Sequence, residues 1–292
     1  LHDFRVALRR LRSWLRAFRP AFADTVSPKV EGRLKKIAKE TGSSRDLEVH
    51  VAWVTSARRT LSPTARAGAT WLLHRLRQQR READAEFRAL IDRKFTTAAA
   101  AAEDALTRYE SSVLDDGDRF AAVAAETIDA QTEALVNAVG RVTGQGDRAE
   151  AHATRIAAKR LRYLLEGVEA AVPDASRLIE ELKRLQNVLG ELHDAQIFGG
   201  ELATMIAELL ASQGSRPARR DGAAPRPNPV VGLRVLSRRM RRAEVVAFQS
   251  YAGQWGTEAT AAFAARVASV ADELRQKAVA PRGARTRIVR RR

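Results

Sequence analysis

A row of basic side chains runs along the first helix that the sequence predicts. Residues 2, 5, 9, 12, 16 and 19 are separated by three or four positions, so they share one face of an α-helix over about 2–19. Like charges one turn apart repel by roughly 0.2–0.5 kcal/mol per pair, and no acid interrupts this row. We therefore expect an external anion to bind it. This row, the first basic stripe, consists of His2, Arg5, Arg9, Arg12, Arg16 and Arg19.

An apolar face accompanies the first basic stripe. Phe4, Leu8, Leu11, Leu15 and Phe18 follow the same three-and-four spacing, displaced by about 100° around the helix. This face predicts burial against a core. The aliphatic stems of the neighbouring arginines would then pack beside the core while their guanidinium groups stay in water.

The basic stripe recurs at an offset of 150 residues. The second copy ends early, because Glu166 and Glu169 stand where the first copy has Arg16 and Arg19. We therefore expect the first copy to contribute more of the anion affinity. The second basic stripe consists of His152, Arg155, Lys159 and Arg162.

A second basic helix follows each stripe. The run Leu34-Lys35-Lys36-Ile37 recurs as Leu182-Lys183-Arg184-Leu185, and Asp46 recurs as Asp194. Two blocks in the same order at nearly the same offset indicate a duplicated unit of about 150 residues. The lysines and arginine of this block that would add to the two sites are Lys35, Lys36, Lys39, Lys183 and Arg184.

The repeated pattern resembles the conserved-histidine α-helical domain, or CHAD, family. The residues that carry the resemblance are a His, an Arg three residues later and a basic Leu-containing run, followed by the Leu-Lys block and an Asp, all in two copies. The resemblance implies an all-helical protein of two similar four-helix bundles that binds inorganic polyphosphate through basic residues. By the same resemblance, the basic residues named above would form the polyphosphate site.

The expected fold is all-α, with two tandem, internally duplicated four-helix bundles, long helices and a basic cleft. The first bundle would span residues 1–143 and the second 147–281, joined by Gly144-Gln145-Gly146, with a flexible loop at 214–229 and a basic tail at 282–292. Ser27-Pro28 and Ser62-Pro63 are typical helix starts, and Gly42 is a plausible helix end. The pattern predicts a helical run from 65 to about 109 and leaves open whether that run is straight or contains a bend. In the second half we expect helices near 148–171, 174–189, 191–212 and 231–278, the last broken near Gly253 or Gly256.

Composition restricts the partners. The 292 residues carry a net charge of +16, which predicts a polyanion: polyphosphate, nucleic acid or an anionic membrane surface. No apolar run is long enough for a membrane span, so we expect no membrane partner. The absence of cysteine fits a reducing, cytoplasmic location, with association with polyphosphate granules. The chain starts inside the first motif, so we expect it to belong to a longer protein.

The residue patterns do not predict an enzyme. The sequence has no phosphate-binding glycine loop and no nucleophile elbow, and no carboxylate cluster for Mg²⁺, so we expect no catalytic residue, cofactor or metal. Three alternatives stay open: a helical nucleic-acid-binding protein, a phosphotransfer bundle that uses His2 or His152, and an anion-gathering part of a longer phosphate-processing enzyme.

Several charged residues receive a structural interpretation. Arg10 and Arg160 lie about 100° away from the stripes, so an ion pair such as Asp3 with Arg10 is the simpler role. Asp46 and Asp194 are interpreted as ion-pair partners that orient an arginine. The remaining histidines, His50, His74 and His193, show no pattern of their own.

Overall fold

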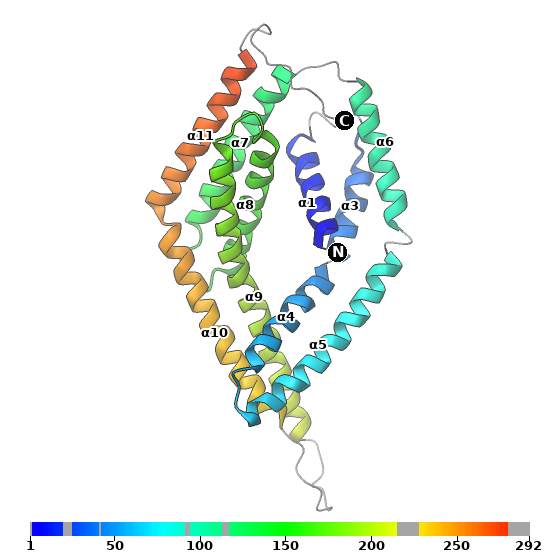
Figure 1. Cartoon of the computed structure of the whole chain (residues 1–292), viewed down its shortest axis with the longest axis vertical. Helices are drawn as coiled ribbons and strands as arrows, with labels where there is room; N and C mark the ends of the chain where they lie inside the picture. Colours follow the sequence, from blue (N-terminus) through cyan, green and yellow to red (C-terminus); the bar gives the residue numbers. More distant parts are fainter. Residues whose placement is uncertain are drawn as a thin grey trace, which may run out of the picture. The chain divides into compact units, whose positions relative to one another are not determined.

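The computed structural model describes residues 2–19, 25–40, 42–90, 94–112, 117–214 and 228–279. These residues form ten α-helices and no strand, which confirms the all-α class (Figure 1). None of the described helices is long and apolar enough to cross a membrane. The helices are α1 (His2–Ala17), α3 (Pro28–Glu40), α4 (Gly42–Arg58), α5 (Pro63–Leu90), α6 (Thr96–Ser112), α7 (Gly117–Gly140), α8 (Arg148–Val168), α9 (Ala175–Gly214), α10 (Pro229–Gln254) and α11 (Thr257–Val279).

The chain divides into two compact units that differ from the two halves of the sequence. Unit 1 comprises Leu1–Arg12, Asp24–Leu106 and Val188–Ala252, and unit 2 comprises Ser13–Ala23, Thr107–Asn187 and Gly253–Arg292. Each unit takes segments from both expected bundles, because the long helix α9 contributes its first part to unit 2 and its remainder to unit 1. The division into bundles at 1–143 and 147–281 therefore stays a prediction about the duplicated sequence.

Unit 1 is built around a helical hairpin of α4 and α5. A four-residue turn joins the two helices, and their apolar sides pack together with α9 and α10. Gly68 of α5 and Gly232 of α10 allow close approach, since a Cβ at Gly68 would lie 2.4 Å from the Pro229 carbonyl oxygen. The main buried residues of this core are Val54, Leu61, Leu72, Leu73, Leu76, Phe198, Leu202, Leu233, Leu236 and Met240.

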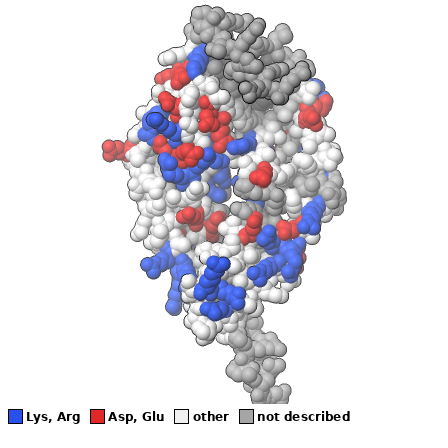
Figure 2. Space-filling view, in the orientation of Figure 1, with Lys and Arg blue, Asp and Glu red and all other residues white. Residues whose placement is uncertain are grey.

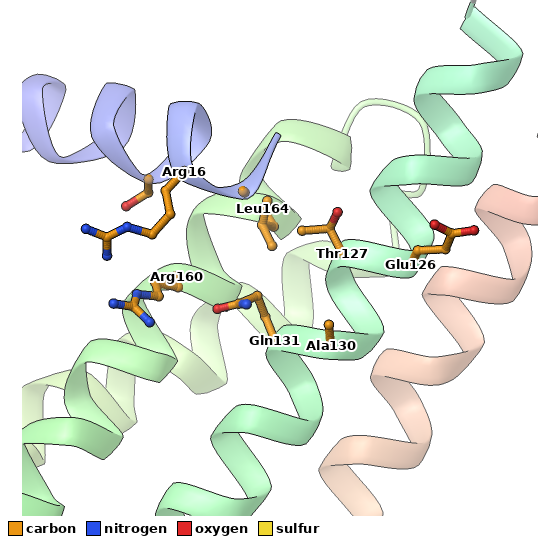
Figure 3. Close-up of a pocket in the computed structure, with 9 residues that line it drawn as sticks. Arg16, Glu126, Thr127, Ala130, Gln131, Arg160 and Leu164 are labelled. Carbon is orange, nitrogen blue, oxygen red and sulfur yellow. The ribbon is translucent and has the colours of Figure 1, made fainter. Parts of the chain in front are cut away.

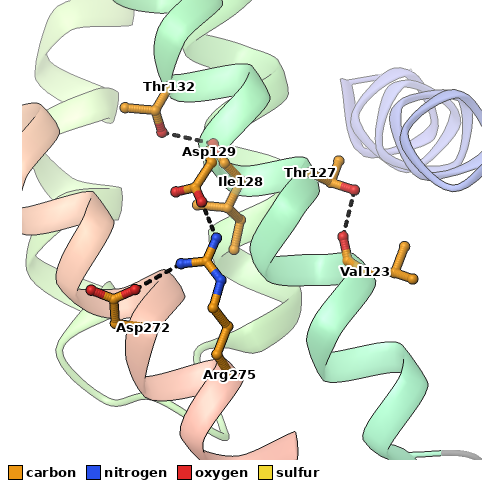
Figure 4. Close-up of polar contacts among 7 residues, drawn as sticks. All are labelled: Val123, Thr127, Ile128, Asp129, Thr132, Asp272 and Arg275. Atoms are coloured by element: carbon orange, nitrogen blue, oxygen red, sulfur yellow. Dashed lines mark hydrogen bonds and ion pairs between the residues drawn. The ribbon is translucent and has the colours of Figure 1, made fainter.

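Unit 2 is built around α7, which packs against both α8 and α11 (Figure 1). Arg275 of α11 links the helices: it donates to Asp129 of α7 and, at 2.7 Å, to Asp272 of its own helix (Figure 4). The hydroxyls of Thr127 and Thr132 donate to carbonyl oxygens one turn earlier in α7, each at 2.7 Å. These contacts pair the polar side chains of Thr127, Asp129 and Thr132 and leave the apolar face of α7 for the core.

The C-terminal part of α1 packs into unit 2 through Trp14. The Trp14 ring stacks on Phe18 at a centroid distance of 5.0 Å and on Phe120 at 6.3 Å. It also occupies the space beside Gly167 of α8, where a Cβ would come within 1.8 Å of the indole. Gly167 therefore provides the room that the indole needs.

The predicted helix starts are confirmed. The Ser27 carbonyl accepts the amides of Val30 and Glu31 at the start of α3. Ser62 caps α5, because its hydroxyl accepts the Ala65 amide at 3.4 Å. The expected break near 253–256 is also present, between α10 and α11.

The helical run expected from 65 to about 109, in which the pattern leaves a bend open, forms two helices, α5 and α6. Two predicted helix boundaries are wrong. Gly42 begins α4 and does not end the preceding helix at a C′ position. In the second half, the two helices expected at 174–189 and 191–212 are one helix, α9, that continues through Gly190. Of the expected loop at 214–229, residues 215–227 lie outside the described residues, as does the basic tail at 282–292.

Candidate anion-binding site

The first basic stripe lies on α1 beside a buried apolar face, as predicted. Leu8, Leu15 and Phe18 are buried, and the stripe residues Arg5, Arg9 and Arg12 are half-buried. The Nε of Arg9 donates to the Arg5 carbonyl oxygen at 3.1 Å, so part of its hydrogen-bonding capacity is used within the helix. Arg16 is exposed. The side chain of His2 lies outside the described residues.

A basic pocket in unit 1 contains one of the predicted residues and two others. Arg33 and Lys36 of α3 meet Lys94 and Thr97 around a cavity of about 250 Å³, with Ile37 at its wall. All three cations are exposed, and none of the described residues that line the cavity is a carboxylate. Lys35 and Lys39 are also exposed on α3 but do not line it. We call this cavity the three-cation pocket.

The sequence did not single out Lys94. It precedes the first turn of α6, and the neighbouring Phe95 packs edge-on against Phe4 at 4.9 Å. That aromatic contact belongs to a cluster with Phe87 of α5, 6.3 Å from Phe4. Lys94 is therefore held by tertiary packing of its neighbour, which no local spacing in the sequence indicates.

A second pocket, in unit 2, brings together Arg16 of α1 and Arg160 of α8. The cavity measures about 310 Å³, and α7 supplies its other wall through Glu126, Thr127, Ala130 and Gln131. Figure 3 shows both guanidinium groups on the same side of the cavity. Ser13, Ala17 and Leu164 complete the lining. We call this cavity the paired-arginine pocket.

The two arginines of this pocket influence each other. Burial lowers the pKa of Arg160, and the positive charge of Arg16 lowers it further. Among the described residues that line the cavity, Glu126 is the one carboxylate, and its side chain points away from both guanidinium groups (Figure 3). The structural role expected for Arg160 stays a prediction, and the structure adds that this residue lines a cavity with Arg16. The helical wheel places Arg160 away from the second stripe, but that direction faces Arg16.

The second basic stripe lies on α8. His152 is exposed, while Arg155, Lys159 and Arg162 are half-buried. Partial burial lowers the pKa of His152, and the charges of Arg155 and Lys159 lower it further. Arg155 and Lys159 therefore add a positive potential at His152.

Two glutamates, Glu166 and Glu180, lie close to cations of the second repeat and partly neutralise their charge. The Nε of Arg162 lies 3.6 Å from an Oε1 of Glu166, and the Nζ of Lys183 donates to Glu180 at 2.6 Å. The hydrogen bond from Lys183 lowers the pKa of Glu180, as do the charges of Lys183, Arg184 and Arg162. The structure thus gathers Arg162, Lys183 and Arg184 around one carboxylate. The sequence predicted the effect of Glu166 but not that of Glu180.

His50 belongs to a buried cluster that the sequence did not indicate. Its ring stacks on Phe198 at 4.1 Å, and its Nδ1 lies 3.4 Å from Glu201 Oε2. Burial lowers the pKa of His50, and the charge of Asp46 opposes that shift. Burial and Asp46 both raise the pKa of Glu201. The sequence signal for this cluster was the spacing of four residues between Asp46 and His50, which places both on one face of a helix. The cluster is not a metal site of the usual kind, because the described residues hold no group of three metal-ligating side chains.

A further basic surface lies at the turn between α4 and α5. Arg239 of α10 donates to the Ala57 carbonyl at 3.1 Å and to the Thr60 hydroxyl at 2.7 Å, which fixes α10 against this turn. Figure 2 shows several groups of Lys and Arg over the region where Figure 1 places α4, α5 and α10. The exposed arginines here are Arg58, Arg59, Arg66, Arg234, Arg238, Arg241 and Arg242.

Comparison with known proteins places the chain in a family. A search of curated proteins finds no match to it. A family model, that of the CHAD domain, matches residues 1–203. The matched region includes both basic stripes, the three-cation pocket and the two arginines of the paired-arginine pocket. Because the match covers more than half of the 292 residues, the chain belongs to the CHAD domain family.

Proposed function

We propose that this protein binds inorganic polyphosphate. The observation that carries the proposal is the convergence of Arg33, Lys36 and Lys94 on one pocket, whose lining among the described residues includes no carboxylate. Each guanidinium offers a fork of donors to phosphate oxygens, and each ammonium adds a mobile point charge. Three cations without an acid repel one another, and a polyanion would relieve that repulsion.

The stripes would extend the contact along a chain of phosphates. Side chains one helical turn apart are separated by about 5.4 Å along the axis, so a flexible polyphosphate can bridge successive residues. Arg5, Arg9 and Arg12 provide such a ladder in unit 1, and His152, Arg155 and Lys159 provide another in unit 2. The presence of the family's domain supports this assignment.

We propose that the protein binds polyphosphate and does not process it. The charged groups that line the two pockets are cations apart from Glu126, and cations hold phosphate without supplying a base or a nucleophile. The Glu126 side chain points away from both guanidinium groups of its pocket (Figure 3). Binding of this kind would place the protein wherever polyphosphate accumulates, including cytoplasmic granules.

Nucleic acid is the competing polyanion. Proteins that bind single strands stack bases on exposed aromatic rings. In this chain the aromatic rings beside the first stripe pack on one another: Phe4 on Phe87 and Phe95, and Trp14 on Phe18 and Phe120. That arrangement favours a ligand that needs cations alone.

The test compares two variants that lose the same charge at different places. The first replaces Arg33, Lys36 and Lys94 with Gln. The control replaces Arg238, Arg241 and Arg242 of α10 with Gln, which are equally exposed. We expect the first variant to lose at least about tenfold in affinity for long-chain polyphosphate, since hydrogen bonds to charged groups contribute about 1.5–3 kcal/mol each. The control should lose only the small effect of net charge.

Titration calorimetry at fixed ionic strength measures both affinities, and single- and double-stranded DNA serve as competitors. Equal losses in the two variants would mean that net charge alone attracts the polyanion. Displacement of polyphosphate by DNA at equal phosphate concentration would favour a nucleic-acid-binding protein.

A further inference from the structure

The paired-arginine pocket contains a buried acceptor without a donor. The Oε1 of Gln131, on α7, is buried and has no hydrogen-bond partner among the described residues. Figure 3 shows the Gln131 amide directed toward Arg160. A buried acceptor left unpaired costs about 1–3 kcal/mol, so a group that supplies a donor here would be favoured.

The neighbouring side chains do not supply that donor. The Thr127 hydroxyl, also in the lining, donates to the Val123 carbonyl at 2.7 Å. Arg160 lies beside Gln131 but makes no hydrogen bond to its Oε1. The pocket therefore combines two cationic donors, Arg16 and Arg160, with one acceptor, Gln131 Oε1, that can accept a hydrogen bond from a ligand hydroxyl.

This combination distinguishes between the phosphates of a polyphosphate chain. An internal phosphate has two bridging oxygens and carries its remaining charge on oxygens that are ionised at neutral pH, so it has no hydroxyl. An end phosphate has a second acidic hydroxyl, whose pKa in phosphate esters is about 6. While this hydroxyl keeps its proton, the end phosphate carries the same charge as an internal phosphate and can also donate a hydrogen bond. In this protonated form the end phosphate alone can accept from two arginines and donate to Gln131.

We propose that the paired-arginine pocket binds the terminal phosphate group of a polyphosphate chain, with Arg16 and Arg160 holding its ionised oxygens and Gln131 Oε1 accepting its hydroxyl. This inference rests on the proposed function and adds recognition of the chain end. The cavity of about 310 Å³ accommodates one phosphate group with its bridging oxygen. Free orthophosphate presents the same chemistry and is the second source of the ligand.

Cyclic trimetaphosphate is the probe that separates ends from interior. It has three internal phosphates and no end, whereas linear tripolyphosphate has two ends. Orthophosphate and sulfate form a second pair, because sulfate has no hydroxyl at neutral pH. We expect the wild-type chain to bind tripolyphosphate at least about tenfold more tightly than trimetaphosphate, and orthophosphate more tightly than sulfate.

Gln131→Met removes the acceptor and keeps the length of the side chain. It should reduce the ratio of linear to cyclic affinity several-fold, while binding of long-chain polyphosphate, which contacts many cations, stays within about twofold of wild type. The control Lys36→Gln lies in the other pocket and should leave the ratio of linear to cyclic affinity unchanged. Gln131→Glu gives a second variant: a carboxylate beside Arg160 would repel the phosphate and abolish preferential binding of the linear form.

The outcomes separate this inference from the proposed function. Equal affinities of wild type for the linear and cyclic triphosphates, or an unchanged ratio in both Gln131 variants, would overturn recognition of the chain end and leave polyphosphate binding intact. Failure of wild type to bind long-chain polyphosphate would overturn the proposed function. Tight orthophosphate binding without a linear preference would identify free phosphate as the ligand of the pocket and reject the chain end.

Discussion

Arg16 lies close enough to Arg160 that its positive charge adds to burial in lowering the pKa of the Arg160 guanidinium. The two residues come from α1 and α8, and both line one cavity in unit 2. Like charges held together raise the free energy of the ligand-free protein, and an anion bound between them recovers that cost. Binding of the proposed anion between Arg16 and Arg160 should therefore stabilise the folded protein.

Polyphosphate affinity should fall steeply with salt. Each phosphate that is neutralised by Lys or Arg releases counterions, so the logarithm of the affinity should decrease linearly with the logarithm of the salt concentration. With three cations in one pocket and more on each stripe, we expect a slope of magnitude about 3 or greater. Titrations between low and moderate salt measure it. A slope near zero would contradict an electrostatic site.

The two stripes should contribute unequally. Converting Arg9 and Arg12 to Glu should weaken polyphosphate binding by at least about tenfold, whereas converting Lys159 and Arg162 to Glu should weaken it several-fold less. The physical reason is that Glu166 lies 3.6 Å from Arg162 and already offsets its charge. Calorimetry on both double variants provides the comparison. The opposite order would show that the second stripe dominates.

The stability of the protein should decrease as pH falls below neutrality. Burial lowers the pKa of His50 below the ordinary value of 6.5, so the unfolded chain binds a proton more readily than the folded one. The stabilisation from neutral His50 is therefore present above pH 6.5 and is lost as pH falls through its folded-state pKa. Urea unfolding at pH 7.5, 6.5 and 5.5 should show this loss.

His50→Gln provides the control, because glutamine does not titrate. Its free energy of unfolding should change less between pH 7.5 and 5.5 than that of wild type. Glu201, whose pKa is raised, acts in the opposite direction but is present in both proteins. His152, with its lowered pKa, contributes in the same direction as His50 and is also common to both. Identical pH slopes would show that His50 does not control the acid sensitivity.

Two glycines in helices should respond oppositely to alanine. At Gly167 a new Cβ would meet the Trp14 indole at 1.8 Å, so Gly167→Ala should destabilise the protein by about 1–3 kcal/mol and change the Trp14 fluorescence. At Gly200, in α9, nothing lies within 4 Å of the new Cβ. Gly200→Ala should therefore stabilise by roughly 0.5–1 kcal/mol. Thermal unfolding followed by circular dichroism and fluorescence tests both; destabilisation at Gly200 would contradict the reasoning.

The residues by themselves determined the local features of this protein. The spacing along α1 predicted an apolar face and the cations beside it. Of that face, Leu8, Leu15 and Phe18 are buried, whereas Phe4 and Leu11 are half-buried. Ser62 before Pro63 predicted the start of α5. These predictions succeed because helical periodicity and capping depend on side chains within one or two turns of each other.

Only the tertiary structure determined that α9 continues through Gly190 and which cations line the same pocket. A glycine in a helix costs about 1 kcal/mol relative to alanine, and the burial of Leu189 and Leu192 on either side of Gly190 outweighs it. Arg160 faces Arg16 because α1 packs on α8 through Trp14 and Gly167. Each pocket is lined from helices that are distant in the sequence, so its charge follows from helix packing and not from the spacing of residues along one helix.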